Sequence, residues 1–123
     1  MTHTLISRWY LKPGREAEAR AALSSLAEAV LAEEPGTLAY LVHEPCGASL
    51  PAAPAGEVTF YEVYADEAAF SAHVSGPVFT GFLKRHGALF EQNFPPNSGP
   101  FMTVSTLKRA AGFVRPGSPD GAG

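Results

Sequence analysis

The sequence has one cysteine, no cluster of basic residues and no long apolar run. Cys46 alone cannot form an intrachain disulfide or build a thiolate metal site. Nine Lys and Arg residues against twelve Asp and Glu residues leave a formal charge of −3, which gives no electrostatic support for binding nucleic acid or an anionic membrane. Because no apolar stretch approaches the roughly 20 residues that span a bilayer and the N-terminus lacks a leader pattern, we expect a cytoplasmic protein that binds no membrane.

The motifs that bind common cofactors are also missing. The chain contains no glycine-rich dinucleotide loop, no phosphate loop and no Gly-x-Ser-x-Gly nucleophile elbow. Its four histidines, at positions 3, 43, 73 and 86, are not spaced as metal ligands usually are. We therefore expect neither a cofactor nor a metal.

The composition is that of one globular domain, since 46% of the 123 residues are hydrophobic. Segments rich in β-branched and aromatic residues predict four strands. Apolar residues at helical spacing predict one long helix and, after Asp66 as a capping residue, two short helices separated by a bend. The strands are expected at 4–12, 37–44, 57–64 and 101–108, the long helix at 15–34, the bend at Gly76–Pro77, and proline-rich loops at 45–56 and 95–100. We expect residues 1–110 to form this domain and residues 111–123 to be a disordered tail.

The order of these elements, βαββαβ, predicts a ferredoxin-like α+β fold with an antiparallel four-stranded sheet. Only one layer of helices is available, whereas the first three strands carry apolar residues on both faces. A monomer would expose one sheet face as a large apolar patch. We therefore expect a homodimer in which the sheets pack face to face. The apolar face of the long helix is predicted to contain Leu23, Leu26, Ala27, Val30 and Leu31.

His73 is the first candidate for chemistry, because it shares a predicted apolar helix face with Phe70 and Val74. An imidazole between helix and sheet can act as an acid or a base. It can also be a core histidine that is satisfied by one hydrogen bond. The pattern alone leaves both interpretations open.

Glu62 is the second candidate, because it alternates with apolar residues in the strand at 57–64 and so places a carboxylate on a buried face. Burying that charge without a partner would be costly. Arg8 in the first strand could neutralise it structurally. His73 could instead share the charge and form a carboxylate–imidazole pair suited to proton transfer.

Aromatic residues from the same elements form the third candidate group. They could line a pocket for a flat ligand, or they could simply be core residues. The predicted ligand-contacting members are Trp9, Tyr40, Phe79 and Phe82.

Three segments of the chain resemble the antibiotic biosynthesis monooxygenase family. They are Lys12-Pro13-Gly14-Arg15 before the long helix, Glu34-Pro35-Gly36-Thr37 after it, and the run from Phe60 to His73. The resemblance covers residues 4–108 and implies a dimeric α+β barrel. In the oxygenases of this family a polycyclic phenol or quinol binds between helices and sheet and loses a proton. The resulting anion reduces dioxygen without metal or flavin.

The resemblance also implies roles for individual residues. Glu62, Tyr64 and His73 would be the catalytic polar set, with His73 as the base or orienting donor, and the aromatic residues would shape the pocket. The haem-degrading members use Trp where this chain has Tyr64, so the sequence departs from them. Our hypothesis is a cofactor-independent monooxygenase that oxidises a flat phenol, hydroquinone or anthrone with dioxygen. The alternatives are a non-catalytic binder of small aromatic ligands, a structural dimer, or an isomerase of a small metabolite, for which the lining is too apolar.

Overall fold

The computed structural model describes residues 1–91 and 101–116, and it confirms the ferredoxin-like α+β fold. The elements follow the order β1 (His3–Tyr10), α1 (Glu16–Glu33), β2 (Thr37–His43), β3 (Glu57–Tyr64), α2 (Glu67–Ser75), α3 (Pro77–His86), a short 3-10 helix (Gly87–Leu89) and β4 (Met102–Leu107). The strands form one sheet in the order β2-β3-β1-β4, and every neighbouring pair is antiparallel. The predicted loop at 95–100 and residues 117–123 of the predicted tail lie outside the described residues.

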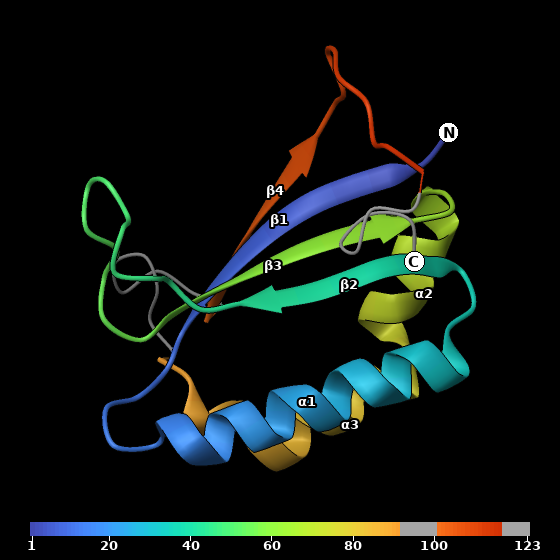
Figure 1. Ribbon diagram of the computed structural model, residues 1–123. Coiled ribbons are helices and arrows are strands. Elements are labelled where there is room, and N and C mark those ends of the chain that lie inside the picture. The colour runs from blue at the N-terminus through green and yellow to red at the C-terminus, as the bar shows by residue number, and fades with distance from the viewer. Residues whose placement is uncertain (92–100, 117–123) are drawn as a thin grey trace.

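One face of the sheet is covered by α1 and α3, while α2 packs at the end of the sheet where β3 finishes (Figure 1). Strict alternation explains how the strands build this arrangement, because successive side chains of a strand point to opposite faces. In β3 the buried residues are Val58, Phe60, Glu62 and Tyr64, and in β1 they are Leu5, Ser7 and Trp9. The helix-covered face therefore carries both the hydrophobic core and one carboxylate.

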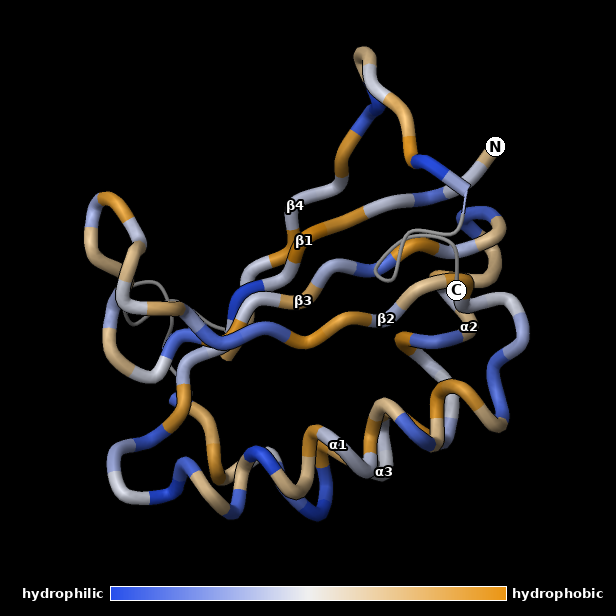
Figure 2. The backbone as a smooth tube through the Cα atoms, viewed as in Figure 1, coloured by the Kyte–Doolittle hydropathy of each residue, from blue (hydrophilic) through white to orange (hydrophobic). Residues whose placement is uncertain are grey.

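The amphipathic pattern of α1 places its small and branched residues against the sheet, and Figure 2 shows hydrophobic and hydrophilic stretches alternating along this helix. Its buried residues are Ala19, Ala22, Leu23, Leu26 and Val30. The prediction for Leu31 is wrong, because its side chain is 85% exposed. The apolar face of α2 is likewise narrower than predicted, with His73 buried and Val74 44% exposed. Each of these exposed residues follows a buried one and is rotated by about 100° from it, away from the sheet.

The start of α2 is held by two local features. Asp66 caps the helix as predicted, since its Oδ1 accepts a hydrogen bond from the Ala69 N–H at 2.8 Å. Gly36, in the turn between α1 and β2, lies against the same helix: a Cβ at Gly36 would come within 2.8 Å of the Ala69 Cβ. The predicted bend is confirmed, because α2 ends at Ser75, Gly76 is its C-terminal cap and Pro77 begins α3. The α1–β2 turn and α2 are thus packed in direct contact.

Among the described residues, no helix is long and apolar enough to cross a bilayer.

Candidate functional site

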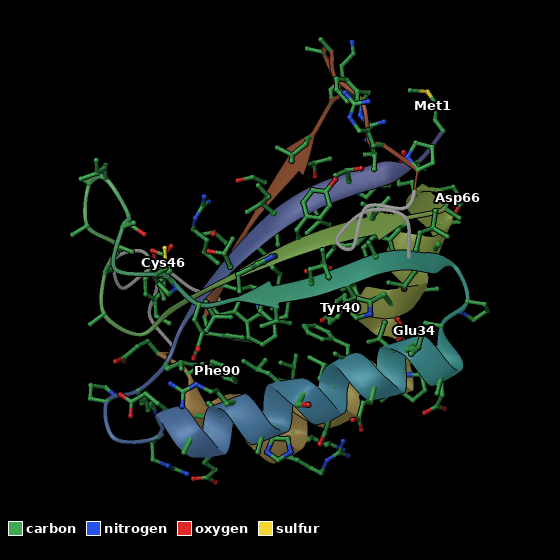
Figure 3. All side chains as sticks on the ribbon, in the orientation of Figure 1. Met1, Glu34, Tyr40, Cys46, Asp66 and Phe90 are labelled. Atoms are coloured by element: carbon green, nitrogen blue, oxygen red, sulfur yellow. The ribbon has the colours of Figure 1, made fainter. Side chains whose placement is uncertain are left out.

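Five polar side chains from four parts of the chain meet beneath the helices. We call them the His73 cluster: Glu34, Tyr40, Glu62, Tyr64 and His73. Glu62 and Tyr64 come from β3, Tyr40 from β2, His73 from α2, and Glu34 from the residue that follows α1. In Figure 3, Tyr40 and Glu34 lie between β2 and the C-terminal half of α1.

The closest pair in the cluster joins His73 to Glu34. His73 Nδ1 lies 2.6 Å from Glu34 Oε1, and the two side chains are 4% and 16% exposed. The Thr37 hydroxyl donates to the same carboxylate oxygen at 3.3 Å. Sequence reasoning missed Glu34 as a site residue, although the motif Glu34-Pro35-Gly36-Thr37 that carries it is part of the family resemblance.

Glu62 is bonded within its own strand. Tyr64, two residues further on and on the same face, donates its hydroxyl to Glu62 Oε1 at 2.5 Å. Arg8 does not neutralise Glu62, because it points from the opposite face of β1, where its Nε lies 3.9 Å from Glu57 Oε1. Of the two partners left open by the sequence, His73 is the one that interacts electrostatically with Glu62.

Burial governs the protonation of these groups. It raises the pKa of Glu62, and the Tyr64 hydrogen bond and the charge of His73 only partly oppose that shift. Burial, then the charges of Glu62 and Glu34, raise the pKa of Tyr40 well above its ordinary value. Burial and Glu62 do the same for the pKa of Tyr64. Both phenols therefore keep their protons.

Three aromatic rings pack around the imidazole. The centroid of the His73 ring lies 5.1 Å from that of Phe79, 5.4 Å from Tyr40 and 5.6 Å from Tyr64. Such rings exclude water and strengthen the electrostatic interactions of the groups they surround. The His73 cluster is therefore a polar centre in a largely apolar enclosure.

The aromatic residues predicted to contact a ligand differ in their surroundings. Trp9 is 1% exposed and belongs to the core, where the centroid of its ring lies 4.3 Å from that of Phe60 and 5.0 Å from that of Phe90. Its indole N–H is satisfied internally by Ser7 Oγ at 2.9 Å. Phe79 and Phe82 join the same core cluster. Their role in binding a substrate stays a prediction.

Tyr40 is different, because it lines an open hollow of about 430 Å³ between α1 and β2. We call this space the α1–β2 hollow; Leu23, Ala27, Val42 and Val58 supply its apolar lining. Arg20 and Glu44, both about half exposed, also line it and form an ion pair of 2.5 Å from α1 to the end of β2. The hollow thus reaches the His73 cluster at Tyr40.

A second hollow, of about 280 Å³, is lined by two members of the cluster. It lies where the α1–β2 turn meets the bend between α2 and α3, and we call it the turn hollow; Glu34, Gly36, His73 and Gly76 line it. Among the described residues, no group of three His, Cys, Asp or Glu side chains is arranged to hold a metal ion.

The fold and the buried cluster define a small ferredoxin-like α+β protein with a histidine–carboxylate centre between helices and sheet. Residues 2–85 match the family model of the antibiotic biosynthesis monooxygenases. The chain belongs to this family.

Solved structures share the fold at low sequence identity. A putative antibiotic biosynthesis monooxygenase from Caulobacter crescentus is 20% identical with a TM-score of 0.71, over 89% of this chain and 91% of that one. A conserved protein from Methanosarcina mazei is 16% identical with a TM-score of 0.69, over 89% and 93% of the two chains. SnoaB from Streptomyces nogalater, described as a cofactor-independent oxygenase and solved as a point mutant, is 16% identical with a TM-score of 0.67, over 93% and 98%. No functionally curated protein matches the sequence.

Proposed function

We propose that this protein is a cofactor-independent monooxygenase that oxidises a flat phenol, hydroquinone or anthrone with dioxygen. The observation that carries the proposal is the His73 imidazole, buried among aromatic rings and held by a carboxylate at 2.6 Å. Family membership supports it, as does the fold shared with SnoaB. A base in a water-excluding aromatic enclosure is what deprotonation of such a substrate requires.

In this proposal His73 removes a proton from the substrate, and Tyr40, which keeps its proton, provides a hydrogen-bond donor near the anion, while Tyr64 donates its hydroxyl to Glu62. For an anthrone, the carbanion gives its electrons to dioxygen as a C–O bond forms, and the peroxide takes the proton back from His73. Loss of water then breaks the O–O bond and the remaining C–H bond and leaves a carbonyl. One dioxygen is consumed and one water is released.

The α1–β2 hollow is the proposed entry for the substrate. Its volume of about 430 Å³ lies within the range of small-molecule sites, roughly 300–1,000 Å³. A flat ligand in this hollow meets Tyr40, whose ring centroid is 5.4 Å from that of His73. Access of the substrate to the imidazole then requires Tyr40 to move.

The homodimer is part of the same proposal. On the sheet face that the helices leave uncovered, Ile6, Tyr10, Leu41, Tyr61 and Val63 are only partly buried. A second copy that packed its own sheet there would remove this apolar surface from water. A single catalytic domain at residues 1–110 and a cytoplasmic location also stay predictions.

The close packing of Trp9 and Phe79 in the core favours a second candidate, in which the α1–β2 hollow holds a small aromatic ligand without turnover. Dioxygen consumption separates the two candidates. Wild-type protein supplied with an anthrone or a naphthohydroquinone in an oxygen electrode should consume dioxygen, and with the anthrone one equivalent for each molecule oxidised.

His73→Gln, which keeps a hydrogen-bond donor for Glu34, should remove this activity while the protein still melts cooperatively. His43→Ala is the matched control. His43, at the end of β2, is exposed, and its ring forms a hydrogen bond with the backbone carbonyl of Thr59 in β3. Ligand-induced stabilisation without oxygen uptake would favour the binding candidate. Full activity in His73→Gln would show that the imidazole is not the base.

A further inference from the structure

We propose that Glu34 is the positioning residue of this site: it accepts the Nδ1–H of His73 and thereby leaves Nε2 as the nitrogen that takes the substrate proton. The use of Nε2 as the base rests on the proposed function. The tautomer itself is a property of the folded chain and can be measured without any substrate.

The carboxylate is held in place by the turn that carries it. The Glu34 N–H donates to the Val30 carbonyl at 2.9 Å, and the Glu34 carbonyl accepts the Thr37 N–H at 2.9 Å. The Thr37 hydroxyl donates to Glu34 Oε1 at 3.3 Å. Backbone and side chain of Glu34 are therefore both tied to the α1–β2 turn, which lowers the entropy lost in holding the imidazole.

The imidazole is tied to the same junction from the other side. α2, which carries His73, packs on the turn through Gly36 and Ala69, with no room for a Cβ at Gly36. The Ala65 N–H, just before the helix, donates to the Gly36 carbonyl at 2.8 Å. The two partners of the 2.6 Å contact thus belong to one packed unit, although they lie 39 residues apart in the chain.

The chemistry of the contact decides which nitrogen carries the proton. An ionised carboxylate has only acceptors, so a hydrogen bond to Glu34 Oε1 requires a proton on Nδ1. In the neutral ring Nε2 then has a free lone pair. When Nε2 takes a proton, Glu34 lies next to the positive charge that forms, in a charge-assisted hydrogen bond stronger than a neutral one.

The position of Glu34 distinguishes it from Glu62. Glu62 is 4% exposed and already accepts the Tyr64 hydroxyl, and burial raises its pKa. Glu34 has 16% of its side chain exposed and lines the turn hollow, so water reaches it without entering the aromatic enclosure. Glu34 is therefore the carboxylate that both contacts the imidazole and stays within reach of water.

The test is the tautomer of His73 in the wild-type protein, read from the ¹⁵N shifts and long-range ¹⁵N–¹H couplings of the ring by NMR at about pH 8. We expect a protonated Nδ1 and an unprotonated Nε2. In Glu34→Gln, whose amide can either accept or donate, we expect the Nε2–H form to appear. Glu33→Gln is the matched control, because it makes the same charge change one residue earlier, where the side chain is exposed, and it should leave the ring unchanged.

Kinetics supply the second readout. Glu34→Gln should lower kcat by about 10²-fold or more with little change in KM, the size expected when general-base catalysis is lost, while Glu33→Gln stays within about twofold. A wild-type ring with its proton on Nε2, a doubly protonated ring, or an unchanged tautomer in Glu34→Gln would overturn the role of Glu34. No oxygen uptake by a wild-type protein that shows the expected tautomer would overturn the proposed function and leave the role of Glu34 standing.

Discussion

Tyr64→Phe tests the electrostatics of the buried carboxylate. The substitution removes one hydroxyl from a fully buried ring and deprives Glu62 of its 2.5 Å donor, while the apolar contacts of the ring remain. A hydrogen bond to a charged group contributes about 1.5–3 kcal/mol, and one between neutral groups about 0.5–1.5 kcal/mol. The cost of the substitution should therefore depend on whether Glu62 is ionised.

The direction in which this cost changes with pH follows from the pKa of Glu62. Burial raises this pKa in the folded protein above its ordinary value of 4.5, so the ionised carboxylate costs folding free energy. That cost is absent below about pH 4.5 and complete once the pH exceeds the raised pKa. Tyr64→Phe removes a contact that lowers the pKa of Glu62, so it raises this pKa further, enlarges the cost and extends the pH window upward to the higher pKa of the variant.

We expect Tyr64→Phe to destabilise the protein by about 1.5–3 kcal/mol at pH 8 and by about 0.5–1.5 kcal/mol at pH 4. At ~4 °C per kcal/mol for a domain of this size, the melting temperature at pH 8 should fall by roughly 6–12 °C. Urea unfolding at both pH values measures the free energies directly. Tyr61→Phe removes a hydroxyl from the opposite face of β3 and serves as the control. An equal cost at both pH values, or an equal cost in Tyr61→Phe, would refute the reasoning.

Three further predictions concern the packing around the site. Ser7→Ala removes the acceptor of the Trp9 indole N–H and should cost about 1–3 kcal/mol; a loss below about 0.5 kcal/mol in urea unfolding would contradict it. Gly36→Ala places a methyl group within 2.8 Å of the Ala69 Cβ and should lower the free energy of unfolding by about 1–3 kcal/mol. NMR should also show a weaker tautomer preference of the His73 ring. Unchanged stability and an unchanged tautomer would show that the turn and α2 can separate freely. Asp66→Ala removes the cap of α2 and should cost about 1 kcal/mol, with faster amide exchange confined to the first turn of that helix.

Local sequence patterns correctly predicted the features that depend on a single helix or strand. Alternation in β3 placed Glu62 on the buried face, and helical spacing placed His73 against the sheet; both residues are buried. The cap at Asp66 and the bend at Gly76 also follow from neighbouring residues alone. Helical periodicity was less accurate for residues at the edge of the apolar face, as the exposed Leu31 shows. One step along a helix rotates the side chain by about 100°, which is enough to turn it from the sheet toward solvent.

The partners of the site residues could not be derived in this way. Arg8 and Glu62 were both strand residues of opposite charge, yet they point to opposite faces of the sheet and each has another partner. Tyr64 was proposed as a catalytic residue from the family resemblance, while its hydrogen bond to Glu62 comes from the tertiary structure. Tyr40 and Trp9 are both aromatic strand residues and cannot be told apart by sequence pattern, but Tyr40 lines an open hollow whereas Trp9 is buried in the core.

The order of the elements, the fold and the burial of the two central site residues follow from local sequence patterns, because hydrophobic periodicity and turn residues act over a few neighbouring positions. The contact between Glu34 and His73 depends on how the elements pack in three dimensions. That contact joins residues 39 positions apart, and it exists because a turn with no side chain at Gly36 lets α2 approach the end of α1. No local pattern encodes a distance between two elements, which is set by how their surfaces pack.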